Sequence, residues 1–299
     1  MAEIGRVLTA MVTPMDAGGA VNYGQARRLA QALVDSGSHG VVVAGTTGEA
    51  PTLADEEKVR LVREVKEAIT GKGTVVAGTG TNDTRHSIEL SREAERAGAD
   101  ALLLVVPYYN RPSQEGLYQH FRAIAQAVNI PCILYNIPGR TSLNMTAETV
   151  IRLSHVDNIV GIKEASGDLV QVSRIAAGAR PGFLIWSGDD LLTLPIMAIG
   201  GYGVISVVTH LAGRKMRAMI EAYRQGQVEE AKRLHFSLVP LMQALMTVGP
   251  NPTPIKWALN HLGIAVGPPR LPLVEPEPDG QERLRNALEG IELDIKAPV

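Results

Sequence analysis

The sequence predicts an α/β fold, a (β/α)8 barrel with a small C-terminal helical domain. Eight short runs rich in Val, Ile and Leu recur along the chain, segments with helical spacing lie between them, and most runs end in polar or Gly-rich sequence. Strands and helices that alternate in this way form a parallel sheet. A barrel of this kind takes about 250 residues, so a chain of 299 residues leaves room for an appendage.

The eight runs have the length of buried strands. Segments between them, such as QARRLAQALVDSG and ADEEKVRLVREVKEAI, place apolar residues at helical intervals, and several end in Gly as helices often do. The alternative is an open doubly wound sheet, which is typically marked by a nucleotide-binding Gly pattern that GTGTND does not complete. A TIM barrel is therefore preferred. The runs are VLTAMV from Val7, GVVVAG from Gly40, TVVAG from Thr74, ALLLVV from Ala101, CILY from Cys132, IVGI from Ile159, FLIW from Phe183 and GVISVV from Gly203.

The segments after the eighth run read as helices. One is expected from about Leu211 to Gln225, and VEEAKRLHFSLVPLMQALM and PIKWALNHLG follow it. A Pro-rich stretch, GPPRLPLVEPEP, precedes a last helix. We therefore expect a catalytic barrel over residues 1–225 and a helical domain over 226–299.

Composition excludes several classes of function. The formal net charge is -2, so the protein as a whole does not attract nucleic acid or an anionic membrane electrostatically. A bound anion would need a specific local binding site. No apolar run has the length of a membrane span, and the first residues do not resemble a signal peptide. The lone Cys132 lies in an apolar run and reads as a core residue of a protein in a reducing compartment, so we expect a cytoplasmic protein. The seven histidines show no metal-ligand spacing, and no metal is expected.

The ends of the predicted strands carry the candidate chemistry. Seven of the eight runs lead into polar or Gly-rich segments. In a closed parallel barrel these segments meet on the C-terminal face, where barrel enzymes place their active sites. They are TPMD, GTTGE, GTGTND, PYYNRP, YNIPGR, KEASGD and SGDD.

Lys163 lies at the end of the sixth run, in NIVGIKEASGD. An amine buried beside Ile and Val is desolvated, which lowers its pKa and provides a neutral nucleophile for a carbonyl carbon. The alternative is a lysine on a solvated rim, paired with a carboxylate such as Glu164 or Asp168. The segment alone leaves both interpretations open, and the chemical one predicts a Schiff base with a small 2-oxo acid.

Two more candidates follow the fifth run, in CILYNIPGR. Neighbouring strands lie about 4.8 Å apart, so the phenol of Tyr135 could lie over the Lys163 amine and transfer protons. Packing with a single hydrogen bond is the alternative for a buried tyrosine. The guanidinium of Arg140 suits bidentate capture of a carboxylate, although surface arginines are usually only solvated.

GTTGE, residues Gly45 to Glu49, follows the second run. Its backbone N–H groups and the hydroxyls of Thr46 and Thr47 could hold a carboxylate, and a simple glycine turn before a helix is the alternative. Tyr108 and Tyr109 stand together in a chain with only 4% aromatic residues. Paired tyrosines at a strand end are typical of an interface or a pocket wall.

These segments together resemble the 4-hydroxy-tetrahydrodipicolinate synthase (dihydrodipicolinate synthase) family. GTTGE, PYYNRPSQEGLY, YNIPGRT, GIKEASGD, SGDD and GGYGVISV occur in its order and spacing, and NPTPIKWAL extends the similarity into the C-terminal helices. The resemblance implies a lyase that condenses pyruvate with L-aspartate 4-semialdehyde, the first committed step of lysine biosynthesis through diaminopimelate. It also implies a homotetramer built from two tight dimers, with no nucleic-acid or membrane partner.

The resemblance implies a role for each catalytic residue. Lys163 would form the Schiff base, and Tyr135 above it would transfer protons. Thr46 and Tyr109 would complete the proton relay, with Tyr109 reaching in from a neighbouring subunit. No cofactor is expected, because the protonated imine is itself the electron sink that stabilises the enamine.

Four residues would bind the substrates by the same resemblance. Thr47 would hold the carboxylate of pyruvate, and Arg140 would bind the carboxylate of the semialdehyde. Gly188 and Ile205 would line the pocket.

Related families leave two alternative functions. N-acetylneuraminate lyase and 2-keto-3-deoxygluconate aldolase share the lysine and GTTGE-like turns, but such lyases generally lack an arginine like Arg140 in YNIPGRT. A noncatalytic pyruvate-binding relative would lose the chemistry. The joint presence of Lys163, Tyr135, Thr46 and Tyr109 argues against it.

One departure from the family concerns inhibition by lysine. Members of the family that lysine inhibits look to have a histidine or similar polar residues after GTTGE, and an acidic residue shortly after GTGTN. This chain keeps Asn82 and Tyr108, and we predict weak or absent inhibition because the neighbouring positions differ. Those positions hold Ala50, Pro51, Asp55, Lys58 and His86.

Overall fold

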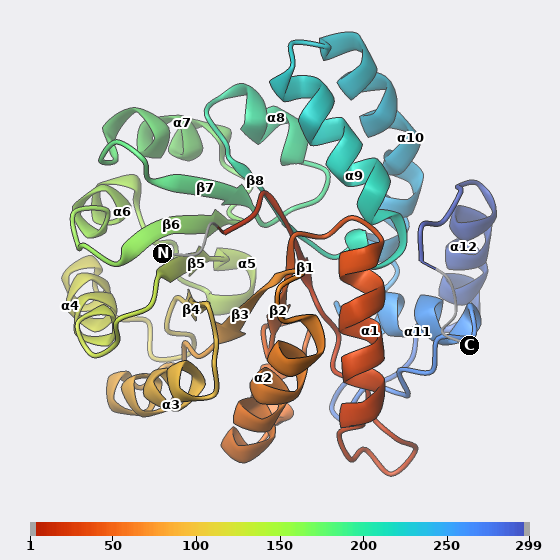
Figure 1. The fold of residues 1–299 in the computed structure, drawn as a ribbon. Helices are drawn as coiled ribbons and strands as arrows, with labels where there is room; N and C mark the ends of the chain where they lie inside the picture. Colours follow the sequence, from red (N-terminus) through yellow and green to blue (C-terminus); the bar gives the residue numbers. More distant parts are fainter. Residues whose placement is uncertain (1–3, 296–299) are drawn as a thin grey trace.

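A computed structural model gives the structure of residues 4–295, and its centre is a closed barrel of eight parallel strands (Figure 1). Each strand pairs with the next in the chain, and β8 pairs with β1 to close the barrel. All eight predicted strands are confirmed. They are β1 Val7–Ala10, β2 Gly40–Val43, β3 Thr74–Gly78, β4 Ala101–Val105, β5 Cys132–Asn136, β6 Ile159–Glu164, β7 Leu184–Ser187 and β8 Gly203–Ser206.

Helices surround the barrel and connect successive strands (Figure 1). Several are capped by the residue before them, as where Asn22 and Asp83 accept a hydrogen bond from the first turn of α1 and α3. The predicted helix after β8 begins at Thr209, two residues before Leu211. The surrounding helices are α1 Tyr23–Asp35, α2 Asp55–Ile69, α3 Thr84–Arg96, α4 Gln114–Ala125, α6 Ala147–Leu153, α7 Leu169–Gly178, α8 Thr193–Ala198 and α9 Thr209–Arg224, with a 3-10 helix at Ala50–Thr52 and a short α5 at Pro138–Thr141.

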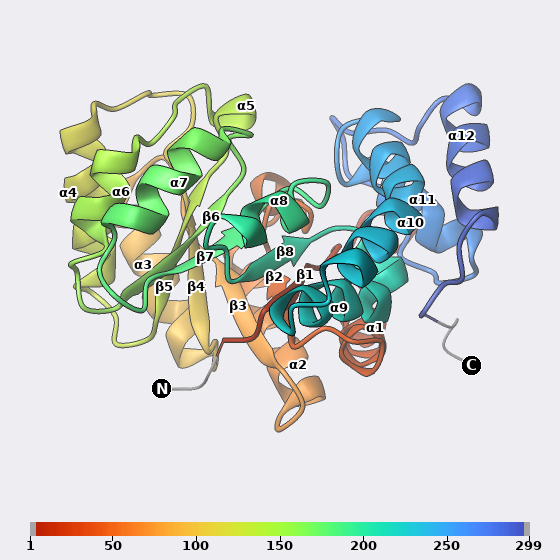
Figure 2. The same ribbon diagram turned by 90° about the horizontal axis from the view of Figure 1, so that it is seen from above.

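Three further helices lie together on one side of the barrel, next to α9 and α1 (Figure 2). They are α10 Val228–Thr247, α11 Thr253–His261 and α12 Pro278–Glu289. The division expected at residue 225 falls in the short connection between α9 and α10, and these two helices pack against each other. No helix within residues 4–295 combines the length and apolar character that crossing a membrane requires.

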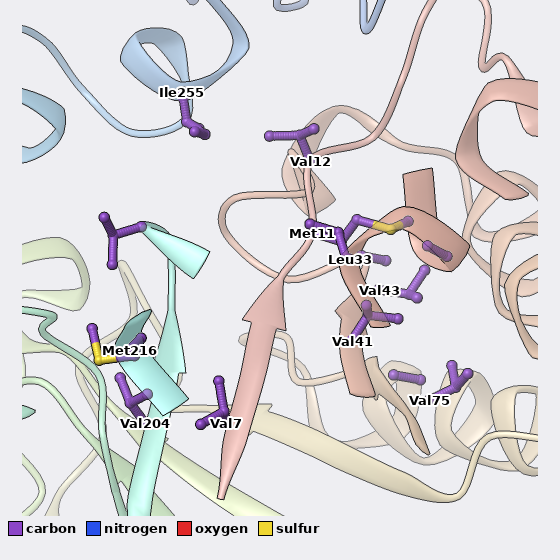
Figure 3. Packing of buried hydrophobic residues seen from close by; sticks show 14 of the residues in the cluster. Val7, Met11, Val12, Leu33, Val41, Val43, Val75, Val204, Met216 and Ile255 are labelled. Atoms are coloured by element: carbon purple, nitrogen blue, oxygen red, sulfur yellow. The ribbon is translucent and has the colours of Figure 1, made fainter. Parts of the chain in front are cut away.

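The strands separate two apolar clusters, because successive side chains of a strand point to opposite faces. Leu8, Ile133 and Trp186 lie in the cluster inside the barrel. Figure 3 shows residues of the outer cluster, in which Val7 and Val204 pack with residues of the surrounding helices such as Met216. Tyr135 belongs to the inner cluster and pairs in register with Lys163, so both side chains point into the barrel.

Candidate active site

Lys163 is buried inside the barrel near the C-terminal end of β6. Its side chain is 5% exposed, and its backbone lies in register between Tyr135 of β5 and Trp186 of β7. The Nζ atom lies 4.3 Å from the centre of the Tyr135 ring. The predicted proximity of the phenol to the amine is therefore confirmed, and the contact is between the amine and the face of the ring.

The two carboxylates that offered an alternative partner for Lys163 are used elsewhere. Glu164 accepts hydrogen bonds from Asn136 Nδ2 at 3.2 Å, Gln171 Nε2 at 3.1 Å and the Ser166 N–H at 2.7 Å. Asp168 accepts from the N–H groups at the start of α7. Within residues 4–295, no carboxylate forms an ion pair with the Lys163 amine. The rim interpretation of this lysine is therefore wrong, and the buried one stands.

Gly188 leaves space for the Lys163 side chain. A Cβ atom at this position would lie 3.0 Å from Lys163 Cε and 2.7 Å from Ala165 Cβ. The Gly188 N–H donates to the Glu164 carbonyl at 2.8 Å, which fixes the loop after β7 against β6. A side chain here would displace the end of the lysine, so Gly188 is required by close packing.

A cavity of about 740 Å³ opens on this face of the barrel. Tyr135, Thr46 and Arg140 line it, together with Tyr108 and Ile137. Strand β5 and the loops after β2 and β5 thus bring three of the predicted site residues to one cavity. Its lining does not include Lys163, Thr47 or Ile205, which are buried, or the partly exposed Gly188.

Four further residues of the lining are polar: Asp55, Lys58, Asn82 and His86. Asp55 accepts from Lys58 Nζ at 2.9 Å and from His86 Nε2 at 2.6 Å. Burial acts to raise the pKa of Asp55, but the hydrogen bonds from Lys58 and His86 outweigh it and hold that pKa below its ordinary value. Asp55 is therefore an ionised carboxylate that accepts from the Lys58 ammonium group and from the His86 ring.

Thr47 and Arg140 are joined by a residue that the sequence did not indicate. The buried hydroxyl of Thr47 accepts from Asn251 Nδ2 at 2.9 Å, and Arg140 Nη2 donates to the Asn251 carbonyl at 3.1 Å. Asn251 comes from the C-terminal segment NPTPIKWAL. That segment predicted only a helix, because nothing in it shows which loop of the barrel it contacts.

The two paired tyrosines have different surroundings. Tyr108 lines the cavity, where burial raises the pKa of its phenol. Tyr109 points away, with 91% of its surface exposed and a backbone φ of 73°. A single chain therefore does not bring Tyr109 to Tyr135 and Thr46. Ile205 lies inside the barrel on β8, in register with Leu8 of β1.

A buried polar network, which the sequence did not indicate, joins the ends of β5 and β6 to neighbouring segments. Asn136 Nδ2 donates to both Glu164 and Asn144 Oδ1, and Gln171 bonds to both of these residues. Burial raises the pKa of Glu164. Because Asn136 and Glu164 directly follow Tyr135 and Lys163, the network fixes the relative position of the two inward-pointing side chains. The signal in the sequence was this pair of polar residues, each placed next to a candidate catalytic residue.

The buried His210 and Cys132 are structural residues. His210 accepts from the Val12 N–H at 3.1 Å and donates to the Val207 carbonyl at 2.8 Å, and burial lowers its pKa to about 4. Burial raises the pKa of Cys132 to about 12. Within the described part of the chain, no three His, Cys, Asp or Glu side chains are arranged to hold a metal ion.

Comparisons of the sequence and of the structure with known proteins point to one and the same family. A model of the dihydrodipicolinate synthetase family matches residues 3–291. The 4-hydroxy-tetrahydrodipicolinate synthase of Moorella thermoacetica is 59% identical over 284 residues, which cover 95% of this chain and 97% of that protein.

Two solved structures extend the comparison. The dihydrodipicolinate synthase of Cyanidioschyzon merolae with lysine bound is 48% identical with a TM-score of 0.94, covering 96% of this chain and 98% of that one. The chloride-inhibited enzyme of Acinetobacter baumannii complexed with pyruvate is 39% identical with a TM-score of 0.93, covering 96% and 99%. The closed barrel, the buried lysine and these similarities together show that the chain belongs to the dihydrodipicolinate synthetase family.

Proposed function

We propose that this chain condenses pyruvate with L-aspartate 4-semialdehyde to give 4-hydroxy-tetrahydrodipicolinate. The observation that carries the proposal is the Lys163 amine, which is buried beside the Tyr135 ring with no carboxylate partner in the described residues. An ion pair would hold the amine as an ammonium group, whereas attack on a carbonyl carbon needs its lone pair.

The reaction begins with an imine on Lys163. The neutral amine adds to C2 of pyruvate, and the carbinolamine loses water to give a protonated imine. This cation withdraws electrons from C3, which loses a proton and becomes the nucleophilic carbon of an enamine. C3 then attacks the aldehyde carbon of the semialdehyde, and attack of the semialdehyde's amine on C2 closes the ring and releases Lys163.

Hydroxyl groups move the protons in this scheme. The Tyr135 phenol takes the proton of the carbinolamine step and returns it when water leaves. Thr46, which lines the same cavity as Tyr135, links that phenol to Tyr109. The exposed Tyr109 reaches the site of a neighbouring subunit, as expected for a homotetramer of two tight dimers. The scheme needs no cofactor, because the protonated imine itself stabilises the enamine.

The substrate carboxylates bind at two separate places. Thr47 holds the carboxylate of pyruvate, next to the strands that carry Lys163. Arg140, at the exposed edge of the cavity, binds the carboxylate of the semialdehyde. Gly188 leaves room for the imine, and Ile205 gives the pocket an apolar wall.

Choice of aldehyde tests the proposal. Pyruvate consumption is measured with aspartate semialdehyde, N-acetylmannosamine and glyceraldehyde in turn, and we expect turnover with the semialdehyde alone. Arg140→Ala is expected to lower kcat/KM for the semialdehyde by about 100-fold, because a charge-assisted pair is lost, while imine formation with pyruvate continues. A higher kcat/KM with either sugar aldehyde would overturn the proposed second substrate.

A further inference from the structure

The segment from Asn251 to Lys256 contacts the loop Gly45–Glu49 at both ends. Lys256 Nζ pairs with Glu49 Oε1 at 2.6 Å, and Asn251 Nδ2 donates to Thr47 Oγ1 at 2.9 Å. The segment leads into α11, outside the barrel, whereas the loop follows the barrel strand β2. The C-terminal helices therefore contact the loop that carries Thr46 and Thr47.

The Lys256 end of this contact is an anchor. Lys256 and Glu49 are both buried, with side chains 1% exposed. Lys256 Nζ also donates to the Pro268 carbonyl at 2.9 Å, and the Arg270 N–H donates to Glu49 Oε2 at 2.7 Å. The backbone of Glu49 is left-handed, with φ of 60°, which is costly for a residue with a side chain. These bonds hold the end of the loop in that conformation.

The Asn251 end acts on a single hydroxyl group. The oxygen of a threonine hydroxyl can accept hydrogen bonds and can donate its own proton once. Because the Asn251 amide donates to Thr47 Oγ1, the hydroxyl accepts from Asn251 and its proton stays available for another acceptor. A carboxylate only accepts hydrogen bonds, so the available proton suits the carboxylate of pyruvate.

We propose that Asn251 is a positioning residue for pyruvate, which orients the Thr47 hydroxyl so that its proton is donated to the substrate carboxylate. This inference rests on the proposed function, in which Thr47 binds that carboxylate. The same residue also accepts from Arg140 through its backbone carbonyl. A change of the Asn251 side chain removes the bond to Thr47 and keeps the backbone group that Arg140 contacts, so pyruvate binding is affected and semialdehyde binding is not.

A double-mutant cycle tests the route through Thr47. Asn251→Ala, Thr47→Val and the double variant are compared by their KM for pyruvate. We expect each single change to raise that KM by about 3- to 10-fold, the size of one neutral hydrogen bond. In the Thr47→Val background, Asn251→Ala should have no further effect, since the hydroxyl that it orients is absent. Fully multiplicative effects would show that Asn251 acts independently of Thr47 and would overturn the inference.

Asn251→Asp tests the direction of the hydrogen bond. A carboxylate at this position accepts the Thr47 proton and adds a negative charge near the bound anion, so the pyruvate KM should rise further, on the order of 30-fold. The KM for the semialdehyde should change much less. If Asn251→Asp binds pyruvate as well as the wild-type protein does, the amide does not donate to Thr47 in solution and the inference is wrong.

Asn260→Ala is the matched control. Asn260 lies in α11, the helix that follows Asn251, and bonds to the backbone of Val266 and Gly267, away from the loop Gly45–Glu49. We expect it to lower the melting temperature and leave both KM values unchanged. A wild-type protein without condensation activity would contradict the proposed function itself. An active wild type with unaltered pyruvate KM in Asn251→Ala would contradict this inference alone.

Discussion

Three lysines are buried in the described part of the chain, and two of them have carboxylate partners. Lys58 pairs with Asp55 at 2.9 Å and Lys256 with Glu49 at 2.6 Å, while Lys163 faces the ring of Tyr135. Burial lowers the pKa of Lys256, and the ion pair with Glu49 opposes that shift. Lys163 has no such carboxylate. The contrast among these three lysines supports the proposal that Lys163 is the nucleophile.

The charges around Asp55 bear on inhibition by lysine. Asp55 already accepts from Lys58 and His86. A lysine bound here would bring its ammonium group next to the Lys58 ammonium group, while the Asp55 carboxylate is already paired. We expect initial rates to stay constant as lysine is added, and His86→Glu to make the rates sensitive to it. Strong inhibition of the wild-type protein, or no gain in His86→Glu, would contradict this reading of the cavity.

His210 makes stability depend on pH. Its folded-state pKa of about 4 is below the ordinary 6.5, because burial disfavours the charged ring. The unfolded chain therefore takes up the proton first, and the stabilisation is complete above pH 6.5 and lost as pH falls towards 4. His210→Gln keeps an acceptor and a donor without titrating.

We expect the free energy of unfolding of wild-type protein to fall between pH 7 and 4.5 by about 2 kcal/mol more than that of His210→Gln. Urea unfolding curves at the two pH values measure this. Equal losses in both proteins would show that His210 does not take up the proton on unfolding. His120, whose pKa burial also lowers to about 4, contributes equally to both proteins.

At the scale of elements, the loop Gly45–Glu49 depends on a buried ion pair from α11. Lys256→Met leaves the Glu49 carboxylate buried without its partner, and we expect this to cost about 3–5 kcal/mol of stability. Lys256→Met with Glu49→Gln removes both charges and should recover most of the loss. Chemical denaturation of the three proteins measures the difference. A double variant as unstable as Lys256→Met would show that the pair is not what links these elements.

The elements themselves were well predicted from periodicity, since buried parallel strands are short apolar runs. The proximity of Tyr135 and Lys163 also followed, because both lie near the C-terminal ends of neighbouring strands. Asn251 and the Asn136–Glu164 network could not be predicted in the same way. Their contacts join segments far apart in the chain, and a polar residue in a sequence does not reveal the partner that satisfies it. The structure of one chain shows only that Tyr109 is exposed and does not line the cavity of that chain.

At the scale of the whole molecule, the exposed Tyr109 predicts complementation between subunits. A Tyr109→Phe chain keeps its own Lys163, and a Lys163→Ala chain keeps the tyrosine that it would lend to its neighbour. Mixed dimers therefore contain one complete site, and coexpression should restore about a quarter of wild-type activity per subunit. The two variants are purified by separate tags and assayed alone and together. Mixed dimers no more active than the separate variants would place Tyr109 outside the neighbouring site.

The central claim, an imine between pyruvate and Lys163, has a direct test. Borohydride reduces an imine to a stable amine, so the protein is treated with pyruvate and borohydride, digested and analysed by mass spectrometry. We predict a mass increment on the peptide that contains Lys163, with none in Lys163→Ala. No increment in the wild-type protein, or an equal increment in Lys163→Ala, would contradict the account.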